Sequence, residues 1–212
     1  NESFPWLSHK SIKLCGEDTR VLKVSYAGEK GFEIHVHNGS MKKIYDELIQ
    51  HGENFNLIHF GMLALDSMRL EKNYRSWKSD LTSDYTMLQS GLEKWIKFDK
   101  GNFIGKEALK NEFDLGTSKK FVTLVVDDPE DNKPFGEPVY LSPVFAGDDY
   151  LGPIVSSGYG HRVKKSISMA ILDDRNLNGL NDQLYIDVLG RKRKAYIVNE
   201  ALYDPENLKL RS

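Results

Sequence analysis

Two patterns of apolar residues follow one another along the chain, and the change between them is the feature that most constrains the fold. Up to residue 113, stretches with helical spacing alternate with short strand-like runs. Residues 114–118 form a turn-rich connection, beyond which short apolar runs are divided by Gly, Pro, Asp and Asn. We therefore expect an α+β domain over residues 1–113, an antiparallel sheet with covering helices, followed over residues 119–212 by a small all-β barrel or sandwich.

The individual elements follow from the same patterns. In the first domain, two strands around a glycine-bearing turn should form a β-hairpin, and Ser40 should N-cap a helix that ends before Gly52. Helical spacing predicts two further helices, over residues 61–70 and 106–113. The strands expected in the whole chain are 21–26, 32–36, 121–126, 138–141, 167–172, 183–188 and 195–198.

Composition and charge argue against several classes of protein. Lysine and arginine number 29 against 31 acidic residues, and the net charge of -2 supplies no large positive field for nucleic acid or anionic lipid. Because Cys15 is the only cysteine, neither an internal disulfide nor a cysteine-based zinc or redox site can form. No apolar run reaches the roughly 20 residues that span a bilayer. We expect a reducing compartment, no nucleic-acid partner and no membrane.

Residues 26–33, Tyr-Ala-Gly-Glu-Lys-Gly-Phe-Glu, combine two turn glycines with two acids. Gly28 and Gly31 allow a tight turn without Cβ strain. From geometry alone, a hairpin with Glu29 solvated at its tip and Glu33 facing outward is the simpler interpretation. The ungapped pattern, however, resembles the folate signature of the glycine-cleavage aminomethyltransferase family.

The resemblance implies a tetrahydrofolate site and indicates its residues. Glu33 stands at the position of the family's pterin-contacting Glu, and a carboxylate suits hydrogen bonds from the amino and ring N–H groups of the pterin edge. Tyr26 matches another ligand position, where it would pack its ring near the pterin and offer a hydroxyl. Trp95, four residues after Gly91, matches a tryptophan that lines the folate channel, with a core tryptophan as the alternative.

A second block, residues 61–72, resembles the family helix that ends in Arg-Leu-Glu. Arg69 and Glu71 match it, and Arg69 is a further candidate cofactor-binding residue, although an ion pair that orders the structure is the alternative. Leu65 stands where the glycine-cleavage branch has a folate-contacting arginine. With the Arg-Leu-Glu-Lys run that follows, Leu65 makes the chain most similar to the C-terminal region of dimethylglycine and sarcosine dehydrogenases.

Three other features have simpler interpretations. Residues 156–162, Ser-Ser-Gly-Tyr-Gly-His-Arg, resemble an element of the family's C-terminal barrel, and we expect a solvated loop there. The basic run 191–194 is typical of a charged hairpin turn, which could attract an anionic polyglutamate tail. His35 and His37 could share one strand face, but no third ligand is evident, so no metal site is expected.

One-carbon transfer to tetrahydrofolate is the function that the resemblance implies. The enzyme would align an aminomethyl or small methylated-amine donor with the folate nitrogen, which is catalysis by proximity. The family's catalytic aspartate lies upstream of the signature, and no segment here matches it, so the catalytic residue is unknown. Because the chain begins at Asn1, we expect a piece of a longer enzyme, inactive alone, with FAD only if a separate upstream oxidase domain exists.

Two alternatives stay open from the sequence. A non-catalytic folate-binding or folate-sensing module could keep the fold without turnover, and a folate-dependent demethylase could act on a sulfur or oxygen methyl donor. The expected partners are folate and a small donor molecule. The expected location is the cytoplasm or, in a eukaryote, the mitochondrial matrix.

Overall fold

Two compact units make up the structure, a computed structural model that describes residues 3–127, 136–174, 177, 179 and 184–211. The first unit combines Asn1–Lys72 with Tyr203–Ser212, and the second is Asn73–Leu202. In chain order, the second unit is therefore inserted between two segments of the first. The domain division expected between residues 113 and 119 falls inside the second unit and stays a prediction.

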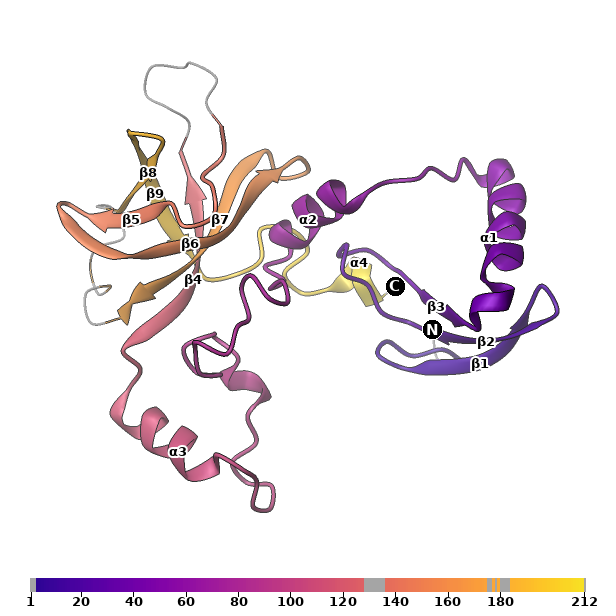
Figure 1. Ribbon diagram of the computed structural model, residues 1–212, viewed down its shortest axis with the longest axis horizontal. Coiled ribbons are helices and arrows are strands. Elements are labelled where there is room, and N and C mark those ends of the chain that lie inside the picture. Colours follow the sequence, from indigo (N-terminus) through magenta and orange to yellow (C-terminus); the bar gives the residue numbers. More distant parts are fainter. Residues whose placement is uncertain (1–2, 128–135, 175–176, 178, 180–183, 212) are drawn as a thin grey trace. The chain divides into compact units, whose positions relative to one another are not determined.

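A three-stranded antiparallel sheet belongs to the first unit (Figure 1). Its strands are β1 (His9–Leu14), β2 (Glu17–Leu22) and β3 (Glu33–Val36), in the order β1-β2-β3. Cys15 and Gly16, both at positive φ, join β1 to β2 in a two-residue turn whose twist suits antiparallel strands. The sequence pattern does not predict β1, because only two of its six residues are strongly apolar. Of the two strands expected in the hairpin, 32–36 matches β3, whereas 21–26 overlaps β2 only at residues 21 and 22; β2 and β3 do pair.

Helical segments complete the first unit. They are α1 (Asn38–Gly52), the 3-10 turn η1 (Glu53–Phe55), α2 (Met62–Glu71) and α4 (Leu208–Arg211). The prediction of Ser40 as the N-cap of α1 is wrong, because His37 caps the helix by accepting a hydrogen bond from Gly39 N at 3.3 Å. The Ser40 hydroxyl and the Lys43 ammonium instead donate to Glu17, each at 2.8 Å, which fastens α1 to β2. The bond from Lys43, followed by that from Ser40, lowers the pKa of Glu17.

A closed antiparallel barrel forms the larger part of the second unit (Figure 1). Its strands are β4 (Lys119–Val126), β5 (Pro143–Ala146), β6 (Asp149–Gly160), β7 (Lys165–Asp173), β8 (Leu184–Val188) and β9 (Arg191–Val198). They close in the order β4-β7-β6-β5-β8-β9. Inward-facing aliphatic side chains fill the barrel, among them Leu124, Ile154, Leu172 and Ile186, all fully buried. The predicted α+β fold class, a sheet with helices followed by a barrel, is confirmed.

Polar contacts hold the irregular segment of residues 74–95 against the barrel within the second unit. Arg75 donates to Ser90 O at 2.8 Å, and its guanidinium lies 4.3 Å from the ring centroid of Phe121 on β4. Burial lowers the pKa of Arg75. Asp80, fully buried, accepts a hydrogen bond from the Ser156 hydroxyl on β6. Two further elements of this region are η2 (Glu93–Trp95) and α3 (Lys106–Leu115).

Three local predictions in the second unit are wrong. Residues 138–141 are not a strand, and β5 begins at Pro143. Residues 156–160 are part of β6 and not a solvated loop. The basic run 191–194 begins β9 and is not a turn; within it Arg193 is 4% exposed and donates to Asp127 O at 2.7 Å and to Gly136 O at 3.2 Å. For Arg193, hydrogen bonds to residues distant in the sequence, which a local pattern does not contain, decide its environment.

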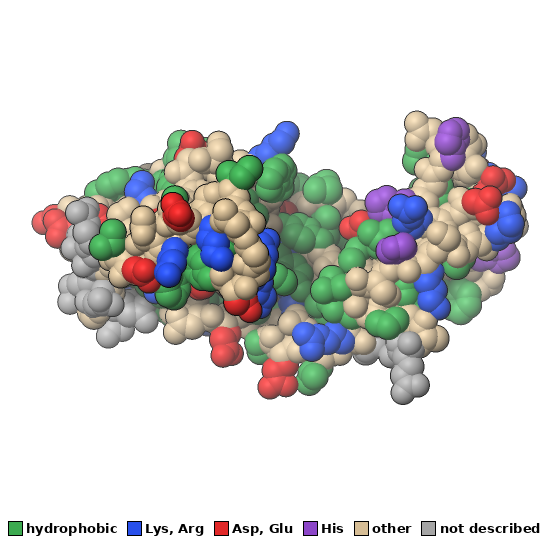
Figure 2. All heavy atoms as spheres, turned by 90° about the horizontal axis from the view of Figure 1, so that it is seen from below, with side chains coloured by type: hydrophobic (Ala, Val, Ile, Leu, Met, Phe, Trp, Pro, Cys, Tyr) green, Lys and Arg blue, Asp and Glu red, His purple; other side chains and the backbone are tan. Residues whose placement is uncertain are grey.

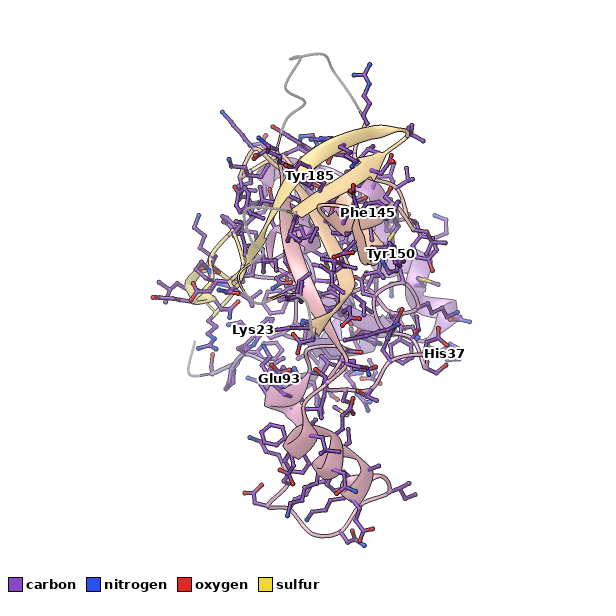
Figure 3. All side chains as sticks on the ribbon, turned by 90° about the vertical axis from the view of Figure 1, so that its left-hand side faces the viewer. Lys23, His37, Glu93, Phe145, Tyr150 and Tyr185 are labelled. Carbon is purple, nitrogen blue, oxygen red and sulfur yellow. The ribbon has the colours of Figure 1, made fainter. Side chains whose placement is uncertain are left out.

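An aromatic group lies on the outer side of β5 (Figure 3). Phe145 pairs in register with Tyr150 of β6 and with Tyr185 of β8. The Phe145 and Tyr150 rings meet edge to face at 5.9 Å between centroids. Because alternate residues of β5 point inward, this group stabilises the outside of the barrel at its shortest strand.

Candidate functional site

The connection between β2 and β3 contains most of the folate-like signature. Gly28 has φ of 79°, in the left-handed region that side chains disfavour. At Gly31, an added Cβ would lie 2.9 Å from Ser25 Cβ and 3.0 Å from Val24 O. Ala27 N donates to Ser25 Oγ at 3.3 Å. Gly28 therefore provides a left-handed backbone conformation, and Gly31 leaves room for the close approach of Ser25 and Val24.

The two acids of the signature have different surroundings. Glu29 is half-buried, and its Oε1 accepts a hydrogen bond from the Tyr203 hydroxyl at 2.6 Å, so the expected solvated position at a hairpin tip is wrong. Glu33 opens β3 with a side chain that is 58% exposed. Its Oε2 accepts from His35 Nε2 at 3.3 Å, and within the described residues its Oε1 has no hydrogen-bond partner. Glu33 therefore has an oxygen available to a ligand.

One face of the sheet carries Glu33 and is polar. Strand alternation puts Glu33 and His35 on this face, and His35 stands opposite Arg20 of β2. Val21, on the other face, is buried. Figure 2 shows histidine and basic side chains on the part of the molecule formed by the sheet and α1. An open hollow of about 580 Å³ is bordered by several of them, including Lys13, Arg20, His35 and His37.

The other predicted site residues lie in three different places. Tyr26, the first residue of the signature, is 36% exposed and lies within the connection between β2 and β3. Arg69 lies near the end of α2, where it is 2% exposed and donates through Nε to Asp66 Oδ1 at 2.7 Å. Trp95, in η2 of the second unit, is 63% exposed, with the Lys94 ammonium 5.3 Å from its ring centroid. The structure thus places Tyr26 within the β2–β3 connection and Glu33 at the first position of β3, and the binding roles of all four stay predictions.

Sequence reasoning did not find the interaction between Glu29 and Tyr203. Nothing in a local pattern links Tyr203 to Glu29, 174 residues away. The chemistry that the exposed groups can offer is hydrogen-bond acceptance by Glu33 and ring packing by Tyr26. Across the described ranges, no three or more His, Cys, Asp or Glu side chains are grouped to hold a metal ion. No helix in those ranges is long and apolar enough to cross a membrane.

Comparisons with known proteins connect this geometry to one family. The family model for the GCVT N-terminal domain matches residues 1–100, and the model for the glycine cleavage T-protein C-terminal barrel domain matches residues 119–204. An aminomethyltransferase from Thermoanaerobacter pseudethanolicus is 30% identical over 193 residues, covering 91% of this chain and 50% of the relative. Human mitochondrial dimethylglycine dehydrogenase is 29% identical over 207 residues, covering 95% of this chain and 23% of the relative.

A solved structure agrees with the fold. The crystal structure of glycine cleavage system aminomethyltransferase T from Bartonella henselae matches with a TM-score of 0.81 at 18% identity, over 97% of this chain and 54% of that one. At this identity the match supports the fold alone. The chain spans about half the length of the aminomethyltransferases that it matches and about a quarter of the dehydrogenase.

Proposed function

Because this chain belongs to the glycine cleavage T-protein family, we propose that it binds tetrahydrofolate and takes part in the transfer of a one-carbon unit to it. The observation that carries the proposal is the signature at residues 26–33, with the Glu33 carboxylate exposed on β3 and one of its oxygens without a partner in the described part of the chain. The family match and the available acceptor are independent of each other, and both support a folate ligand.

Glu33 has the chemistry that a pterin edge needs. That edge presents neighbouring amino and ring N–H donors, and an ionised carboxylate accepts two such bonds side by side. His35, by donating to Oε2, orients the carboxylate and leaves Oε1 free for a ligand. Tyr26, partly exposed, offers an aromatic ring for packing and a hydroxyl.

The remaining residues are assigned weaker roles. Trp95, in the second unit, is exposed and stays a candidate ligand residue on the family resemblance alone. Arg69 is buried and bonded to Asp66, which favours a role in fixing the end of α2 over direct contact with the ligand. Leu65 lies half-buried on the same helix, and this apolar residue supports the dimethylglycine and sarcosine dehydrogenase branch.

Binding of this kind serves transfer by positioning. Tetrahydrofolate, when bound, supplies the nitrogen that accepts the one-carbon unit from an aminomethyl or N-methyl donor. The residues of this chain hold and orient the pterin, which lowers the entropic part of the barrier. No residue here is proposed as the catalytic acid or base. A folate-binding module without turnover is the second candidate, and absence of the family's catalytic aspartate from the full-length protein would favour it.

Calorimetric titration with tetrahydrofolate tests the binding step. Glu33→Gln keeps the shape of the side chain but removes the charge, and the loss of charge-assisted hydrogen bonds should weaken binding roughly 10- to 100-fold. Glu53→Gln, an exposed charge change on η1, serves as the control and should leave the affinity unchanged. No binding by the unmodified protein, or equal binding by Glu33→Gln, would falsify the assignment. Transfer itself is then measured with an isotopically labelled N-methyl donor, and bound folate without label transfer would favour the second candidate.

A further inference from the structure

The last residues of the first unit return to the signature connection. Residues 203–211, called here the terminal strap, begin with Tyr203, whose backbone N–H donates to Glu71 O at the end of α2, at 3.0 Å. Its hydroxyl donates to Glu29 Oε1 at 2.6 Å. One tyrosine therefore joins the end of α2 to the acid that follows Gly28.

Lys72 joins the strap to Gly28, the residue that precedes Glu29 in the same turn. Its side chain is 1% exposed, and its ammonium donates to Asp204 O at 2.5 Å and to Asn207 Oδ1 at 2.8 Å. The aliphatic stem passes so close to Gly28 that a Cβ there would lie 2.3 Å from Lys72 Cγ. A buried ammonium is stable only when its donors are satisfied, so the strap fixes the Lys72 side chain, and the stem in turn confines Gly28.

The strap has a fixed conformation of its own. The Asp204 carboxylate accepts hydrogen bonds from the backbone N–H groups of Leu208, at 2.8 Å, and Lys209, at 3.3 Å, and so caps α4. Leu210 is 2% exposed and anchors the helix in the first unit. Burial raises the pKa of Asp204, but the bonds from the Lys209 and Leu210 N–H groups and the charge of Lys72 outweigh it and lower the pKa. Tyr203 and Lys72 are therefore held by a rigid element.

We propose that the terminal strap is a positioning element for the folate site, acting through Tyr203 on Glu29 and through Lys72 on Gly28. Held at Gly28 and Glu29, the signature of residues 26–33 presents Tyr26 and Glu33 in one arrangement before the ligand arrives. Preorganisation of this kind raises affinity because less ordering is left to binding. The ligand part of this inference rests on the proposed function. Tyr203 and Lys72 are positioning residues and do not contact the ligand.

Amide hydrogen exchange of residues 26–33, together with tetrahydrofolate titration, tests the strap. Tyr203→Phe removes only the hydroxyl, so exchange in this segment should become faster and affinity should fall roughly 5- to 10-fold. The control is Tyr196→Phe on β9, because no hydrogen bond of the Tyr196 hydroxyl occurs in the described structure; neither measurement should change. Thermal unfolding of both variants shows whether a general loss of stability explains the result.

A rescue series at Glu29 separates positioning from a bulk structural effect. Glu29→Gln retains an oxygen that can accept the bond from Tyr203, so it should keep the protection and most of the affinity. Glu29→Ala should behave like Tyr203→Phe, and the double variant should be no worse than either single one.

The outcomes distinguish the strap from the folate assignment. Unchanged exchange at residues 26–33 in Tyr203→Phe overturns the strap alone. Faster exchange with unchanged affinity overturns its positioning role. If the unmodified protein binds no tetrahydrofolate, the proposed function is overturned and the ligand role of the strap with it, whatever the exchange measurement shows.

Discussion

Gly28→Ala should destabilise the first unit for two separable reasons. At φ of 79° the left-handed backbone costs alanine about 1–2 kcal/mol. The new Cβ would also lie 2.3 Å from Lys72 Cγ and 2.7 Å from Cδ. Because Lys72 is buried and its ammonium is bonded to the strap, its stem cannot move aside freely, and overpacking adds about 1–3 kcal/mol. The expected loss of unfolding free energy is therefore about 2–5 kcal/mol.

Gly16→Ala is the matched control for this prediction. Gly16 has φ of 82° in the same unit, but the nearest atom to an added Cβ is Lys43 Nζ at 3.9 Å. Only the backbone cost of about 1–2 kcal/mol should appear there. Native-state hydrogen exchange of the β2 and β3 amides measures the opening free energy of the first unit separately from the barrel. Equal losses in the two variants would refute the argument that the Lys72 stem confines Gly28.

Three further outcomes are expected. In the barrel core, Leu124→Ala should lower the unfolding free energy by about 2–5 kcal/mol in urea titrations, whereas Leu189→Ala, 78% exposed, should change it by less than about 0.5 kcal/mol. Arg193→Met should cost about 1–3 kcal/mol for each backbone carbonyl left without its donor, and Lys192→Met, an exposed neighbour, should leave the melting temperature unchanged. Because the pKa of Asp204 is lowered in the folded protein, the stability that its ionised carboxylate contributes is fully present above the unfolded pKa of about 3.9. This stability is lost as pH falls through the folded pKa. In Asp204→Asn, the stability of the first unit should therefore depend less on pH below about pH 4, as measured by circular dichroism. An unchanged acid transition would contradict this.

The sequence predicts those parts of the molecule that local patterning decides. The apolar runs of β4, β7 and β8 are recognised because continuous apolar sequence fills the buried parts of these strands, and α2 and α3 are recognised from the helical spacing of their apolar residues. The two signature glycines are likewise recognisable, since Gly28 needs a left-handed backbone and Gly31 a close approach. Glu33 is identified by its place in a family pattern, and its exposure on β3 agrees with that use.

What the sequence does not predict depends on contacts between distant residues. Arg193 looks like part of a charged turn, yet carbonyls from remote loops satisfy its guanidinium and allow it to be buried. Ser40 has the residue type of a helix cap, but its hydroxyl donates to Glu17, 23 residues earlier, and His37 caps the helix instead. Glu29 looks solvated, although Tyr203 binds it from near the other end of the chain. In each case the residue type permits two environments, and only the tertiary contacts choose between them.

The order in which the two units occur along the chain has a consequence for synthesis. A ribosome releases β1 to α2 first, then the barrel strands, and the residues from Tyr203 onward only after them. The barrel contains all of its own strands, so its folding does not need the strap. The first unit cannot complete the packing around Gly28 and Lys72 until the strap has left the ribosome. A premature stop or proteolytic cut just before Tyr203 would thus spare the barrel and impair the unit that was made earliest.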